Sequence, residues 1–125
     1  MGIDIYAEWN GQSVEERERQ ASVWLTSEHG AAGYLREAYH GEPYATQFLF
    51  AEAFNSETFD ARIPAAELRG NLEKALELVE ERARTLYNAT DAEVEAEKQS
   101  FRDFVALCER KEKETGEPVR IIASY

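Results

Sequence analysis

The residues best suited to recognition or chemistry are concentrated in one segment, residues 33–44. It contains three tyrosines, one arginine and one of the two histidines of the chain. Tyrosine and arginine are enriched at binding hot spots. We therefore predict a binding site here, and its candidate residues are Tyr34, Arg36, Glu37, Tyr39, His40, Glu42 and Tyr44.

Two roles are open for this segment. In the first, it is a ligand-binding or catalytic site, with His40 as an acid or base and Arg36 as the anchor of an anion. In the second, its aromatic side chains complete the core and its edge, while Arg36 pairs with Glu37 or Glu42. The residue types fit both roles.

Other catalytic or metal-binding patterns are weak. The two histidines, His29 and His40, show neither HxH nor HxxxH spacing, so a metal site is not expected. The single cysteine, Cys108, falls on the apolar stripe of a predicted helix, where a thiol is buried and inert. No nucleophile or phosphate-binding motif is present. We predict no catalytic residue, no metal and no cofactor.

The charge of the chain is strongly negative. It carries 25 acidic and 14 basic side chains, a net charge of −11, and has no lysine or arginine between Arg36 and Arg62. Such a field repels nucleic acid and anionic lipid and favours basic proteins. A basic protein partner is therefore expected, with no direct nucleic acid and no membrane. The alternative is that the charge serves only solubility.

The expected compartment is the cytoplasm. The N-terminus has an early acid and no basic stretch, unlike a signal peptide. No apolar run approaches the roughly 20 residues of a membrane helix. A lone cysteine allows no disulfide within the chain.

The elements that must position segment 33–44 follow from periodicity. Alternating apolar residues, turn signals and β-branched residues predict strands at residues 3–9, 21–26, 58–63 and 119–125. Residues 34–40 are predicted to form a two-turn helix, in which Arg36 and His40 are neighbours. A short capped helix is predicted over residues 13–20 and a loop over 27–33, while 46–50 fits either strand or helix.

Two long amphipathic helices dominate the second half. Apolar residues recur every three to four positions over residues 72–87 and again over 94–108. The mixed charges at 80–82 and 109–114 are expected to be solvated helix faces. A helical hairpin covering one side of a sheet follows. We predict a single α+β domain over residues 1–125, a two-layer sandwich whose antiparallel or mixed sheet has about 3–5 strands.

Three stretches of the sequence carry a resemblance. They are the opening MGIDIY, the block GYLREAYHGEPYAT at residues 33–46 and the stretch SFRDFVALCERKEKETGEP at residues 100–118. Together they resemble a family of short proteins of unassigned function from bacteria and their phages. The resemblance implies a small stand-alone protein, in the setting of a mobile element, and brings no activity with it.

These observations favour a non-catalytic acidic protein that binds a basic protein partner. Its sharpest form is a phage-encoded, anti-CRISPR-like inhibitor, whose carboxylates occupy a groove meant for phosphates in a host nucleic-acid-binding defence complex. Two alternatives are kept. One is a small ligand-binding domain or enzyme that uses residues 34–44; the other is an interaction domain that forms a homodimer through the hairpin or an unpaired sheet edge.

Overall fold

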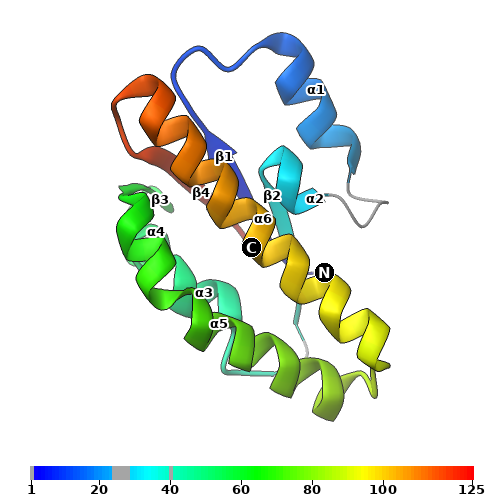
Figure 1. Ribbon diagram of the computed structural model, residues 1–125. Coiled ribbons are helices and arrows are strands. Elements are labelled where there is room, and N and C mark those ends of the chain that lie inside the picture. The colour runs from blue at the N-terminus through cyan, green and yellow to red at the C-terminus, as the bar shows by residue number, and fades with distance from the viewer. Residues whose placement is uncertain (1, 24–28, 40) are drawn as a thin grey trace.

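The sheet has four antiparallel strands in the order β2-β1-β4-β3 (Figure 1). The computed structural model describes residues 2–23, 29–39 and 41–125. The strands are β1 (Gly2–Glu8), β2 (Tyr34–Ala38), β3 (Asp60–Ile63) and β4 (Val119–Ser124). The first and last strands of the chain are thus central, whereas β2 and β3 form the edges. Three of the predicted strands are confirmed.

Alternation along the central strands separates the two faces of the sheet. In β1, Ile3 and Ile5 are buried against the helices, whereas Asp4 and Tyr6 lie on the opposite face. The same period of two in β4 buries Val119, Ile121 and Ala123. A strand with one apolar face must cover that face with another layer.

The covering layer is the predicted helical hairpin of α5 (Ala65–Leu86) and α6 (Asp91–Thr115) (Figure 1). Thr90 and Glu93 form a reciprocal capping box that fixes the start of α6. The α+β architecture with a long hairpin is confirmed. The hydrophobic core lies between the two layers, and its largest fully buried side chains include Phe50, Phe104, Ile3, Ile5, Leu35, Ile63, Leu68, Ile121, Val105 and Val119.

Shorter helices complete the layer and its margin. The predicted capping box at Ser13 opens α1 (Val14–Ser22). The ambiguous run at residues 46–50 is helical, as α3 (Ala45–Leu49) followed by α4 (Ala51–Phe54). Within the described residues, no helix is long and apolar enough to cross a membrane.

The predicted helix at residues 34–40 is wrong, because residues 34–38 form β2. The strand pairs with β1, so that Leu35 lies level with Ile5 and Glu37 with Ile3. Leu35 and Glu37 face the helical hairpin. Because the inward residue Glu37 is polar, the sequence of β2 does not show the alternation of apolar and polar residues that is typical of a strand. Pairing with a central strand overrode the local helical pattern.

The predictions for residues 21–33 also need correction. Instead of starting a strand, residues 21–22 end α1, while residues 24–26 lie outside the described part of the chain. The expected loop contains α2 (His29–Ala32), packed against α6. Gly30 permits this contact, because a Cβ there would lie 1.9 Å from the carbonyl oxygen of Ser100. The short helix matters because it places His29 beside β2.

Candidate functional site

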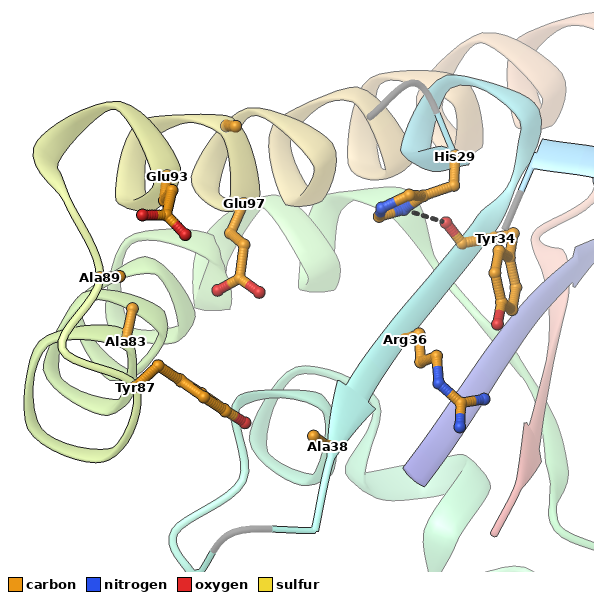
Figure 2. A pocket seen from close by; sticks show the side chains of 10 residues that line it. His29, Tyr34, Arg36, Ala38, Ala83, Tyr87, Ala89, Glu93 and Glu97 are labelled. Atoms are coloured by element: carbon orange, nitrogen blue, oxygen red, sulfur yellow. Dashed lines mark hydrogen bonds between the residues drawn. The ribbon is translucent and has the colours of Figure 1, made fainter. Parts of the chain in front are cut away.

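A pocket of about 480 Å³ lies along the outer edge of β2, where the strand faces the turn between α5 and α6 (Figure 2). Part of its wall is the strand itself, and the rest comes from α2 and the hairpin. Its lining residues are His29, Tyr34, Arg36, Ala38, Ala83, Tyr87, Ala89, Glu93, Ala96 and Glu97. The pocket brings together side chains from β2, α2 and both helices of the hairpin.

The strand presents main-chain groups to this pocket. The amide of Ala7 donates to the carbonyl of Gly33 at 2.9 Å, which fixes the phase of hydrogen bonding between β1 and β2. Because inward and outward groups alternate in an antiparallel pair, Leu35 and Glu37 bond to β1. Tyr34, Arg36 and Ala38 therefore turn their N–H and C=O groups outward, and these are the three strand residues that line the pocket.

Both ends of this outward row are already capped. At one end, Nδ1 of His29 lies 3.2 Å from the carbonyl oxygen of Tyr34, so that this nitrogen must carry the proton. At the other end, Arg82 donates to the carbonyl of Ala38 at 3.0 Å. Between them, the N–H and C=O of Arg36 bond to no other described residue.

The wall opposite the strand is acidic. Glu93 and Glu97 project from α6 toward β2 (Figure 2). One carboxylate oxygen of Glu93 accepts the Thr90 amide of the helix cap at 3.1 Å. The carboxylate of Glu97 forms no hydrogen bond or ion pair with the described residues, although solvent reaches it. It is therefore available to a cationic group.

The protein environment of Glu97 raises its pKa above the ordinary value of 4.5. The main cause is the loss of hydration inside the hollow; repulsion from Glu37 adds to it, and attraction to Arg82 opposes it. A cation placed in the pocket would offset both unfavourable effects, because it stabilises the charged carboxylate. The carboxylates of the pocket therefore attract a positively charged group.

Behind the pocket lies a buried ion pair between Glu37 and Arg82, with Nε 3.1 Å from the carboxylate. Glu37 also accepts the amides of Ala45 and Thr46, at 2.8 and 3.0 Å, and so caps α3. Arg82 donates to the carbonyls of Ala38, Gly41 and Pro43 as well. We call this pair, with the carbonyls and amides it binds, the clamp, because it fixes the chain between β2 and α3.

The clamp corrects the expectation that residues 80–82 are a solvated charged face. Arg82 is only 5% exposed. It lies three residues after Val79, on the same helix face, and is buried because Glu37 and several carbonyls satisfy its guanidinium. The guanidinium also stacks 4.7 Å above the ring centre of Tyr44.

The predicted residues Tyr34 and Arg36 lie at the pocket, yet their side chains turn away from it. Arg36 extends over β1 (Figure 2), where its guanidinium lies 2.7 Å from the carboxylate of Asp4. The Tyr34 hydroxyl donates to the same carboxylate. Burial and this acidic partner raise the pKa of Tyr34 to about 12. Since Asp4 neutralises Arg36, the expected anion anchor is already occupied.

The other predicted residues are dispersed. Glu37 belongs to the clamp, and the ring of Tyr44 lies against the Arg82 guanidinium. Tyr39 is partly exposed and meets the ring of Tyr44 at 6.2 Å between centres. Glu42 is exposed beside a separate hollow formed with Pro43 and Phe48, and His40 lies outside the described residues.

Sequence reasoning missed His29, Tyr87, Glu93 and Glu97 as site residues. A signal existed for Glu97, because it falls between Val94 and Phe101 on the apolar stripe of α6. A charged residue at an apolar position indicates a partner or a cavity. No comparable signal exists for His29 or Tyr87, whose positions depend on α2 and on the turn of the hairpin.

Nucleophilic and metal chemistry find little support in the described residues. Cys108 is fully buried, as predicted, and burial raises the pKa of its thiol. No group of three or more histidine, cysteine or acidic side chains within residues 2–23, 29–39 and 41–125 is arranged to hold a metal ion.

The chain was compared with protein-family models, with curated proteins and with solved structures. No family model matches it, and neither does any curated protein or solved structure. A functional assignment must therefore be argued from the pocket.

Proposed function

We propose that this chain is a non-catalytic acidic protein that binds a basic protein partner at the pocket beside β2. The observation that carries the proposal is Glu97, a carboxylate in a partly enclosed hollow, with a raised pKa and no partner among the described residues. A lysine or arginine side chain is the protein group that satisfies such a carboxylate.

The surroundings of the pocket favour a cation over an anion. Both arginines described beside the pocket are neutralised by an acid: Arg82 by Glu37 and Arg36 by Asp4. Glu93 adds a second carboxylate to the wall. The pocket therefore has a negative field of its own, within a chain whose net charge is −11.

The two scales of charge have different roles. The overall negative charge accelerates encounter with a basic surface. Salt weakens this effect, because charges separated by more than the Debye length of about 8–10 Å are largely screened at physiological ionic strength. The pocket supplies a directional contact, because its two carboxylates project from fixed positions on α6 although solvent reaches them. Binding should weaken steeply with salt and still depend on the two pocket carboxylates at a fixed salt concentration.

The test is a pull-down from bacterial lysate at low and high salt, repeated with two variants of equal net charge. One variant carries Glu93→Gln and Glu97→Gln; the control carries Glu15→Gln and Glu18→Gln on the exposed surface of α1. We expect a basic partner that the control retains and the pocket variant loses. Equal capture by both variants would show that the pocket is not the binding site.

A narrower form of the proposal is an inhibitor of a nucleic-acid-binding defence complex, in which the acidic protein occupies a phosphate groove. The net charge of −11 supports this form. It predicts that the purified partner loses its nucleic acid when the protein is added. Binding of nucleic acid and of this protein at the same time would contradict it.

A small cationic ligand is the second candidate, and the volume of the pocket favours it. About 480 Å³ falls within the range of small-molecule sites. A thermal-shift screen of polyamines and of arginine and lysine derivatives tests this alternative. Stabilisation that Glu97→Gln abolishes would support it, whereas no shift with any amine leaves the protein partner as the occupant.

A further inference from the structure

We infer that the partner binds as an added strand on the outer edge of β2 and places one lysine or arginine side chain in the pocket. This inference rests on the proposed function, because it takes the partner to be basic. It adds the mode of recognition, in which main-chain hydrogen bonds supply alignment and one cation supplies selectivity.

Within the part of the chain that the structure describes, the outer edge of β2 is unpaired at its centre. Arg36 turns its N–H and its C=O outward, and neither group bonds to another described residue. An exposed strand edge of this kind is a template for another extended chain. A residue of an antiparallel added strand, placed opposite Arg36, would exchange two hydrogen bonds with it.

The open part of this edge is short, because side chains occupy a carbonyl group at each end. His29 occupies the Tyr34 carbonyl and Arg82 occupies the Ala38 carbonyl. The opening therefore has room for full pairing at one residue, with looser contacts on either side. A short extended segment fits this opening, whereas a long strand would have to displace both caps.

The register with β2 fixes the direction of the side chains on an added strand. Leu35 and Glu37 face the hairpin, and Arg36 faces the opposite side of the sheet. Partner residues level with Leu35 and Glu37 must face the hairpin too, because side chains on adjacent strands share faces. These positions lead toward Glu93 and Glu97, so the cation belongs next to the residue paired with Arg36.

The same register argues against a second copy of this chain. Antiparallel pairing of two β2 strands about Arg36 would place Leu35 and Glu37 of each copy on the hairpin side, and Glu37 is already bound to Arg82 of its own chain. Neither copy would offer a cation to the pocket of the other, and two molecules that each carry −11 repel one another. The edge lacks the base that the pocket requires.

The decisive variants are Arg36→Pro and Arg36→Ala. Proline removes the outward N–H and no bond of the β1–β2 ladder, since the inward groups belong to Leu35 and Glu37. Both variants lose the ion pair with Asp4, so alanine is the matched control. Circular dichroism and thermal unfolding establish that both are folded before binding is compared.

The probe is the peptide acetyl-Thr-Val-Lys-Val-Thr-amide, titrated into the full isotope-labelled chain and followed by NMR. We expect shifts at Arg36 and Glu97, slower exchange of the Arg36 amide, and loss of both effects when glutamine replaces the lysine. Arg36→Pro should weaken binding about tenfold relative to Arg36→Ala, through the loss of one main-chain hydrogen bond. Exchange at Arg36 in the unsubstituted chain gives an answer even if Arg36→Pro does not fold.

The outcomes separate this inference from the proposed function. If Glu93→Gln with Glu97→Gln abolishes binding and Arg36→Pro matches Arg36→Ala, the basic partner stands and strand addition is overturned. Absence of any response to the lysine peptide also overturns strand addition. A dimer detected by light scattering and dissociated by Arg36→Pro would assign the edge to a second copy instead.

Discussion

Glu37 and Glu97 differ in their surroundings although both are close enough to Arg82 to interact with it. Glu37 is buried, bonds to the Arg82 guanidinium and caps two amides of α3. Glu97 faces a hollow, with its pKa raised and no partner among the described residues. The fold supplies the hydrogen-bond partners of Glu37, whereas the carboxylate of Glu97 remains open to solvent and to the partner that we propose.

The comparison separates a carboxylate with a structural role from one that we propose to bind a partner. The segment richest in tyrosine and charge contributes Glu37 to the clamp and Tyr44 to the ring contact with Arg82. The acidic wall of the proposed binding site comes from α6, where the sequence analysis named no site residue. Unsatisfied bonding capacity in a cavity is thus a better guide to the site than local residue composition.

The largest effect should come from breaking the clamp with Arg82→Met. The variant leaves Glu37 buried without its cation, which costs about 3–5 kcal/mol for such pairs. For a chain of this size the melting temperature should fall by about 10–20 °C. Calorimetric unfolding measures the change. Adding Glu37→Gln should recover part of the loss, because glutamine removes the charge and its oxygen still accepts an amide; no recovery would contradict the role given to the pair.

Exchanging one carboxylate at a time gives the next largest contrast. Glu37→Gln should lower stability by about 1–3 kcal/mol, because charge-assisted hydrogen bonds inside the protein are lost. Glu97→Gln should leave stability at neutral pH unchanged or higher and should weaken capture of the basic partner at least tenfold. Chemical denaturation and binding assays on the same preparations measure both. Similar losses of stability in the two variants would contradict the different roles given to Glu37 and Glu97.

Much of this contrast depends on contacts that are distant in sequence. The hairpin, the central strands and the burial of Cys108 follow from periodicity, which is a local property. Residues 34–38 could not be assigned locally, because their inward position 37 is polar and becomes tolerable only through Arg82 on another element. The same holds for the pocket, which exists only once β2, α2 and α6 meet.

Charged residues on apolar stripes were nevertheless an available signal. Arg82 interrupts the stripe of α5 and Glu97 that of α6, and both lie on the faces turned toward the sheet. Two such interruptions of opposite sign on adjacent helices predict a shared polar site. The sequence could not show which carboxylate pairs with Arg82: Glu37 does, and Glu97 has no partner in the part of the chain that the structure describes.

The pH dependence of stability should distinguish Glu97 from a solvated carboxylate. Its folded pKa is raised, so the folded state holds the proton more tightly than the unfolded chain does. The protonated carboxyl of Glu97 therefore adds to the free energy of unfolding. This contribution is complete below the ordinary pKa of 4.5 and is lost as pH rises through the folded pKa. Relative to the native chain, Glu97→Gln should therefore gain stability as pH increases. Thermal unfolding between pH 4 and 8, with Glu15→Gln as the control, checks the sign.

The smallest effect should come from a carboxyl pair outside the pocket. A hydrogen bond with Glu67, followed by partial burial and repulsion, raises the pKa of Glu52 to about 7. Its favourable contribution is present at low pH and lost as pH rises through 7. Glu52→Gln should raise the melting temperature by about 1–3 °C at pH 8 and leave it unchanged at pH 5, since surface pairs contribute little.

The same variant tests whether a raised pKa by itself marks a binding carboxylate. Glu52 owes its shift first to another carboxyl group, whereas Glu97 owes its shift to the hollow in which it lies. Glu52→Gln should therefore leave binding of the basic partner unchanged at constant salt, when measured beside Glu97→Gln. Equal losses of affinity in the two variants would mean that net charge, and not the pocket, governs recognition.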